Sequence, residues 1–149
     1  MEHPYDKVYH YEVVENQGKF FEDLQDITPQ IDSADLIVAY MKGYTRRQLD
    51  EGHAWYLTLD ARHLKEVFLQ ESGYVMKPGE PISGFMPNWI GRFYADAQWR
   101  YGIPSAELVD LLQPLDLCAV YLGAHDLDLR LAVEKIAGPV LERYSPERK

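Results

Sequence analysis

The sequence predicts a mainly helical, single-domain protein with a short β element at its N-terminus. Apolar residues recur at helical spacing in most segments after residue 33, and glycines and prolines separate these segments at short intervals. Apolar residues make up 46% of the 149 residues, which is enough to form a core. Because the expected helices are short and closely joined, we expect a small orthogonal multi-helical domain rather than a regular four-helix bundle.

The β element is expected at residues 7–14, which are rich in β-branched and aromatic side chains. Residues 15–19 contain asparagine and glycine and are typical of a turn. Residues 20–27 fit either a short helix or a second strand, and the pattern does not decide between the two. Pro29 ends this segment in both cases.

The next two helices are predicted from their end signals. Ser33 is a good N-cap for a helix through Lys42, and Gly43 is expected to end it in the left-handed conformation. Thr45 then begins a second helix, because Gln48 follows three residues later and completes a capping box.

Asp60 is expected to cap a third helix that runs to about Glu71, and Gly73 follows as its stop. Residues 74–88 contain several prolines and glycines and predict the longest loop of the chain. Loops of this length in small domains are often functional or mobile.

Another group of helices is expected in the C-terminal half of the chain. Their predicted ranges are 88–101 with Asn88 as N-cap, 105–113 with Ser105 as N-cap, 115–121 ending at Gly123, and 126–137 with Asp126 as N-cap. The last of these is apolar around most of its circumference, so we expect it to be the central, buried helix. Gly138 and Pro139 should end it.

The chain shows no internal repeat and no linker that would divide it. Residues 1–144 are therefore expected to form one globular domain. Residues 145–149 are expected to be a disordered tail.

The net charge is −9, from 24 acidic and 15 basic residues. An acidic chain repels phosphates and anionic lipids, so nucleic acid and membranes are disfavoured as partners, and a basic protein surface is favoured. The N-terminus lacks the features of a signal peptide, and no apolar run approaches the ~20 residues of a membrane span. The single cysteine, Cys118, cannot form an intrachain disulfide. These observations predict a cytoplasmic protein.

The most enzyme-like residues are His53, His63 and Glu66, with His125 as a further candidate. His63 and Glu66 are three residues apart on a predicted helix, so they can share a face and bind one metal ion. A metal site needs further ligands, however, and this spacing is common on solvated helices. We therefore expect no metal and no cofactor, and we keep a small metal-dependent or general acid–base enzyme as the alternative function.

Residues 100–110 have the outline of a helix-turn-helix motif. A DNA-reading helix carries basic or amide side chains toward the groove, whereas this one offers Glu107 and Asp110. An acidic DNA mimic or a DNA-associated regulator is therefore the weaker alternative.

The best candidates for binding a partner are Trp99, Arg92 and Trp55. Trp99 shares the polar side of its predicted helix with Arg92, and an exposed tryptophan beside an arginine is typical of binding hot spots. The alternative is that the N-terminal segment or the 74–88 loop covers Trp99. Trp55 lies beside Tyr56 on the second predicted helix. We therefore expect a non-catalytic regulatory or adaptor protein that binds another protein or associates with itself.

Overall fold

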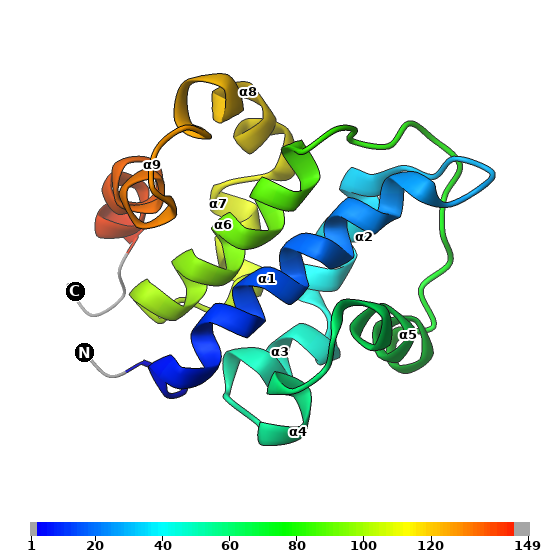
Figure 1. The fold of residues 1–149 in the computed structure, drawn as a ribbon, viewed down its shortest axis with the longest axis horizontal. Coiled ribbons are helices and arrows are strands. Elements are labelled where there is room, and N and C mark those ends of the chain that lie inside the picture. Colours follow the sequence, from blue (N-terminus) through cyan, green and yellow to red (C-terminus); the bar gives the residue numbers. More distant parts are fainter. Residues whose placement is uncertain (1–2, 145–149) are drawn as a thin grey trace.

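The computed structural model describes residues 3–144 and shows helices packed around one core (Figure 1). The helices are α1 (Lys7–Asp23), the short 3₁₀ helix η1 (Leu24–Asp26), α2 (Ser33–Lys42), α3 (Tyr44–Asp50), α4 (Ala54–Leu57), α5 (Ala61–Ser72), α6 (Met86–Tyr101), α7 (Ser105–Leu111), α8 (Pro114–Ala124) and α9 (Leu129–Tyr144). The predicted helical class is confirmed. The orthogonal arrangement stays a prediction, and the expected tail at 145–149 lies outside the described residues.

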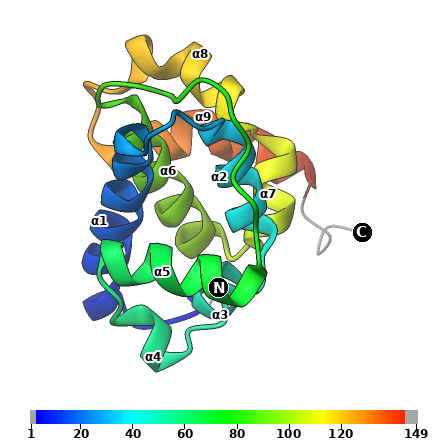
Figure 2. The ribbon, with the colours of Figure 1, turned by 90° about the vertical axis from the view of Figure 1, so that its right-hand side faces the viewer.

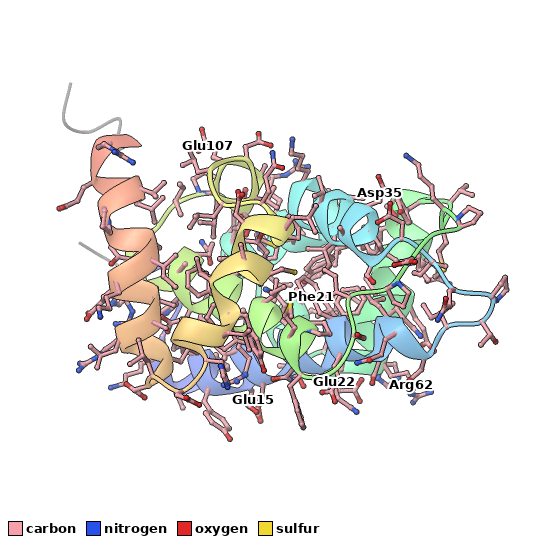
Figure 3. All side chains as sticks on the ribbon, turned by 90° about the horizontal axis from the view of Figure 1, so that it is seen from above. Glu15, Phe21, Glu22, Asp35, Arg62 and Glu107 are labelled. Atoms are coloured by element: carbon pink, nitrogen blue, oxygen red, sulfur yellow. The ribbon has the colours of Figure 1, made fainter. Side chains whose placement is uncertain are left out.

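The expected N-terminal β element is wrong, because residues 7–23 form the single helix α1. Within residues 3–144 there is no strand, and one isolated β-bridge joins Ile31 to Pro78. The inner face of α1 is a helical stripe that includes Val13, Phe20 and Phe21. Figure 3 shows Phe21 pointing into the interior. Burial of this stripe outweighs the strand propensity of the individual residues.

Helices α1 and α6 lie side by side, with α6 in the interior and α1 at one edge of the molecule (Figures 1 and 2). They cross at Gly18 and Gly91, where the two backbones are in contact. A Cβ atom added to Gly91 would lie 2.5 Å from the carbonyl oxygen of Gln17 and 2.8 Å from the Cα of Gly18. The expected turn at residues 15–19 is therefore wrong. Gly18 lies within α1, where the absence of a side chain lets the two helix backbones touch.

The central helix is α6 and not α9, which corrects the expectation for the last predicted helix. The buried side chains of α6 surround it and include Trp89, Ile90, Phe93 and Tyr94. In contrast, α9 packs with one side only, and Leu131 on its outer side is 46% exposed.

The predicted end of α9 at Gly138 and Pro139 is also wrong, since the helix continues to Tyr144. Ala137 and Leu141 are buried on either side of the proline, whereas Pro139 itself is exposed. Packing of the inner face therefore keeps the helix intact across a residue that usually breaks it.

Several predicted helix ends are confirmed by cap geometry. The Asp60 carboxylate accepts a hydrogen bond from the His63 backbone N–H at 2.9 Å. Gly73 and Gly102 follow α5 and α6 with φ of 64° and 65°, the left-handed conformation that glycine adopts easily.

Other predicted ends are shifted. Asp32, and not Ser33, caps α2, and Gly43 is extended with φ of −88°. Thr45 lies within α3 instead of capping it, and Asn88 lies within α6, which begins two residues earlier.

The ends predicted near α7, α8 and α9 are shifted too. Ser105 is the first residue of α7 and is buried. Helix α8 runs through Gly123 to Ala124, and α9 begins at Leu129 rather than after Asp126.

A buried arginine ties four helices together. The Arg46 Nε donates to Asp50 Oδ1 at 3.1 Å and to Ser105 Oγ at 3.0 Å. Its two Nη groups donate to Gln17 Oε1 at 2.6 Å and to Gln98 Oε1 at 3.2 Å. A fully buried guanidinium is stable only when its donors and its charge are matched, and here α1, α3, α6 and α7 each supply a partner.

The part of the chain that the structure describes contains no helix with the length and apolar character needed to cross a membrane.

Candidate interaction surface

An aromatic surface lies where α3, α4 and α5 meet, and we call it the Trp55 cluster. It consists of Tyr44 and Arg47 of α3, Trp55 and Tyr56 of α4, and Glu71 of α5. The Trp55 side chain is 59% exposed, as expected from the sequence, and Tyr44 is exposed beside it. Tryptophan, tyrosine and arginine are the residues most enriched at binding hot spots.

Tyr56 is the centre of this cluster. Its ring packs edge-on against Trp55, with centroids 4.9 Å apart, and against Tyr44 at 6.5 Å. Its hydroxyl donates to Glu71 Oε2 at 2.5 Å, and the other oxygen of Glu71 accepts from Thr45 Oγ1 at 2.7 Å. The hydrogen bond to Glu71, followed by desolvation, raises the pKa of the Tyr56 phenol well above its usual value.

The local fold explains why Trp55 projects into solvent. Gly52 has φ of 75°, and its left-handed conformation ends α3 and turns the chain into α4. A Cβ atom at Gly52 would collide with the carbonyl oxygen of Pro4, so the N-terminal segment packs against this turn. Helix α4 is a single turn, and the Thr58 hydroxyl after it donates to the Trp55 carbonyl at 2.8 Å.

A cation lies over the aromatic edge of the cluster. The Arg47 guanidinium carbon is 5.5 Å from the centroid of the Tyr44 ring, within the range of a cation–π interaction. Trp55 is thus presented on a surface whose neighbouring side chains are already held in place, and this lowers the entropy that a partner must remove on binding.

The enzyme-like residues have local partners at the surface. His53 Nε2 lies 3.2 Å from Glu51 Oε1, and His63 Nδ1 lies 2.8 Å from Asp60 Oδ1. Both histidines and Glu66 are exposed. Among residues 3–144, no three histidine, cysteine or acidic side chains lie close enough to hold a metal ion.

The structure brings Arg92 and His125 together. From the sequence, Arg92 was a candidate for binding a partner and His125 a candidate catalytic residue. Both line a surface hollow of about 400 Å³ between α6 and α8, together with Trp89 and Tyr121. The His125 ring stacks on Tyr121 with centroids 4.5 Å apart, and its Nδ1 is 2.9 Å from the Tyr121 carbonyl. The Arg92 Nε donates to Asn88 Oδ1 at 2.8 Å.

The expected exposure of Trp99 is wrong, because the N-terminal segment covers this residue. Trp99 is only 5% exposed. The rings of His3 and His10 stack on the indole with centroids 3.7 and 4.0 Å away, which places one imidazole on each face. The indole Nε1 donates to the Tyr5 carbonyl at 2.9 Å. Trp99 is therefore part of the buried core and is not a surface anchor in this structure.

His10, which stacks on Trp99, also belongs to an ionic group with Asp96 and Arg100. Asp96 Oδ1 is 2.8 Å from His10 Nε2, and both carboxylate oxygens are 3.0 Å from Arg100. Burial raises the pKa of Asp96, but the hydrogen bonds from His10 and Arg100 outweigh burial and hold it below the usual value. The spacing of Asp96 and Arg100 on one helix predicts their pairing, whereas no local signal predicts a contact with His10, 86 residues away.

Comparison with protein-family models, with curated proteins and with solved structures gave no match.

Proposed function

We propose that this chain is a non-catalytic regulatory or adaptor protein of the cytoplasm that binds another protein through the Trp55 cluster. The observation that carries the proposal is the 59% exposure of Trp55 beside a tyrosine held by Glu71. Full burial of a large apolar side chain contributes ~1.5–3 kcal/mol, so a partner that covers the exposed part of Trp55 gains a share of this free energy. Because the neighbours are already ordered, little of it is offset on binding.

The charge of the chain favours a partner with a basic surface. A net charge of −9 attracts such a surface over long distances and raises its rate of association. Close to Trp55, the exposed Glu71 can accept hydrogen bonds from lysine or arginine. The surface positions and local partners of His53, His63 and Glu66 favour binding over the acid–base alternative.

The test begins with a photo-cross-linking residue at position 55 in the cells that make the protein. The control carries the same residue at Val75, which is exposed in the loop before α6. We expect a discrete adduct from position 55 that position 75 does not give. The adduct identifies the partner for measurement with purified proteins.

With that partner, Trp55→Ala should weaken binding about 30-fold or more, the effect of losing a hot-spot residue. Val75→Ala should change the dissociation constant by less than about twofold, since isolated surface substitutions have small effects. Circular dichroism should show that both variants are folded. Binding by Trp55→Ala equal to that of the wild type, or identical adducts from both positions, would contradict the proposal.

A further inference from the structure

Helix α8 is mostly apolar and has Asp116 in its first turn as its one charged residue, and yet it lies at the edge of the molecule (Figures 1 and 2). No charged residue occurs between residues 117 and 124. Leu117 and Ala124 pack inward, whereas Leu115 is 66% exposed and Leu122 is 80% exposed. Because a helix with so few polar residues is normally buried, the exposed leucines on the outer side of α8 lack a packing partner.

A groove beside these leucines extends the apolar surface onto α9. It has a volume of about 330 Å³, and its walls come from α8 and α9. On α9, the half-exposed Leu131 lies one turn before Lys135, which lines the groove. We define the α8–α9 face as Leu115, Ala119, Val120, Leu122, Gly123, Leu131 and Lys135.

We propose that the α8–α9 face binds the same face of a second copy of this chain in a two-fold symmetric dimer. Leu115, Ala119 and Gly123 lie on successive turns of one side of α8. Since Leu115 and Gly123 are equally far from Ala119, antiparallel α8 helices with the two-fold axis at Ala119 place each Leu115 opposite Gly123 of the other copy. Nothing lies within 4 Å of the position of a Gly123 Cβ, so this position has room for a leucine.

A complementary ion pair favours a second copy as the occupant. The net charge of −9 repels a second chain, and the uncharged stretch 117–124 is where this repulsion is least. Lys135 lies beside the C-terminal half of α8. Because the two α8 helices are antiparallel in this arrangement, that half faces the N-terminal half of α8 in the second copy, which contains Asp116. Symmetry forms this Lys135–Asp116 pair twice. Asp126 and Asp128 follow α8 and disfavour an anionic lipid surface as the alternative cover.

The size of the face indicates a weak dimer. A standard interface buries about 800 Å² on each partner, a tenth of the 8078 Å² surface of this chain. Helix α8 is only ~16 Å long, so a pair of such helices with the edge of α9 falls below that standard. We therefore expect reversible dimerisation with a dissociation constant in the micromolar range.

Sedimentation velocity over a wide concentration range tests the dimer. The wild type should shift from monomer to dimer as the concentration rises. Gly123→Leu and Leu122→Glu should each weaken dimerisation at least about tenfold, because the first fills the groove and the second adds a charge to the face. Both positions are open to solvent, so circular dichroism should show folded monomers.

Disulfide cross-linking tests the position of the two-fold axis, because a residue on the axis meets its own copy. In a Cys118→Ser background, Ala119→Cys should form a disulfide-linked dimer faster than the control Val75→Cys. A wild type that stays monomeric at all concentrations, or equal cross-linking from both positions, would overturn the proposal.

The dimer and the Trp55 cluster are tested independently. Trp55→Ala should leave the dimer unchanged, so loss of one interaction does not imply loss of the other. If the wild type is monomeric and Leu122→Glu abolishes binding to a different protein, the face belongs to that partner and the second-copy proposal is wrong.

Discussion

Replacement of Gly91 by alanine tests the contact between α1 and α6. The new Cβ would lie 2.5 Å from Gln17 O and 2.8 Å from Gly18 Cα. Both atoms belong to the backbone of α1 and cannot rotate away, so the helices would have to move apart. The neighbouring buried residues, among them Phe93 and Phe20, would lose part of their packing.

The magnitude follows from two opposing contributions. Overpacking of a close contact costs ~1–3 kcal/mol, whereas replacement of a helical glycine by alanine contributes ~1 kcal/mol through helix propensity. Gly123→Ala is the matched control, because its Cβ meets nothing within 4 Å. The propensity gain is common to both variants, so their difference in free energy of unfolding measures the helix crossing at ~1–3 kcal/mol.

Urea denaturation followed by circular dichroism, at a concentration where the chain is monomeric, measures both variants. We expect Gly123→Ala to be slightly more stable than the wild type and Gly91→Ala to be less stable than Gly123→Ala. In thermal melts, each kcal/mol corresponds to ~2–4 °C for a chain of this length. Equal stabilities of the two variants would refute the close crossing of α1 and α6.

Two further predictions concern the contacts that His3 and His10 make with α6. Trp99→Ala should lower the free energy of unfolding by ~3–5 kcal/mol, because it removes a buried indole that packs between His3 and His10; a loss below ~1 kcal/mol in urea denaturation would show that the N-terminal segment does not cover it. The pKa of Asp96 is lower in the folded chain than in the unfolded chain, so its contribution is present above the unfolded value of ~3.9 and is lost as the pH falls through the folded value. Asp96→Asn should therefore flatten the acid side of the curve of stability against pH, and an unchanged acid side would contradict this role.

The helices that were predicted best from the sequence have capping residues at their own ends. Asp60 caps α5 with its own carboxylate, and Gly73 ends it in the left-handed conformation. These interactions involve residues within one turn of the helix end, so they are visible in a short stretch of sequence.

The elements that were mispredicted depend on distant residues. The N-terminal segment resembles a strand and a turn by composition, but α1 forms because its inner stripe packs on α6 and Gly18 meets Gly91. Pro139 is a helix breaker by rule, yet α9 continues because Ala137 and Leu141 pack inward around it. In both cases a contact remote in sequence decides the local conformation.

The same distinction applies to the candidate site. Periodicity placed Trp99 on the polar side of its predicted helix with Arg92, whereas in the structure Trp99 is buried. It could not show that His3 and His10 cover that side, because His3 lies 96 residues from Trp99 in the sequence. Trp55 was identified from its neighbours along the chain, whereas the hydrogen bond from the adjacent Tyr56 to Glu71 requires α5 to lie close to α4.

The buried Arg46 has a consequence for how the chain folds. Its guanidinium loses its water only when Gln17, Asp50, Gln98 and Ser105 are all in position to replace it. A partly collapsed chain that lacked one of these segments would hold a desolvated charge with unmatched donors, at a cost of several kcal/mol. Intermediates of this kind are therefore penalised, and the helices that meet at Arg46 are expected to form and to melt together as one cooperative unit.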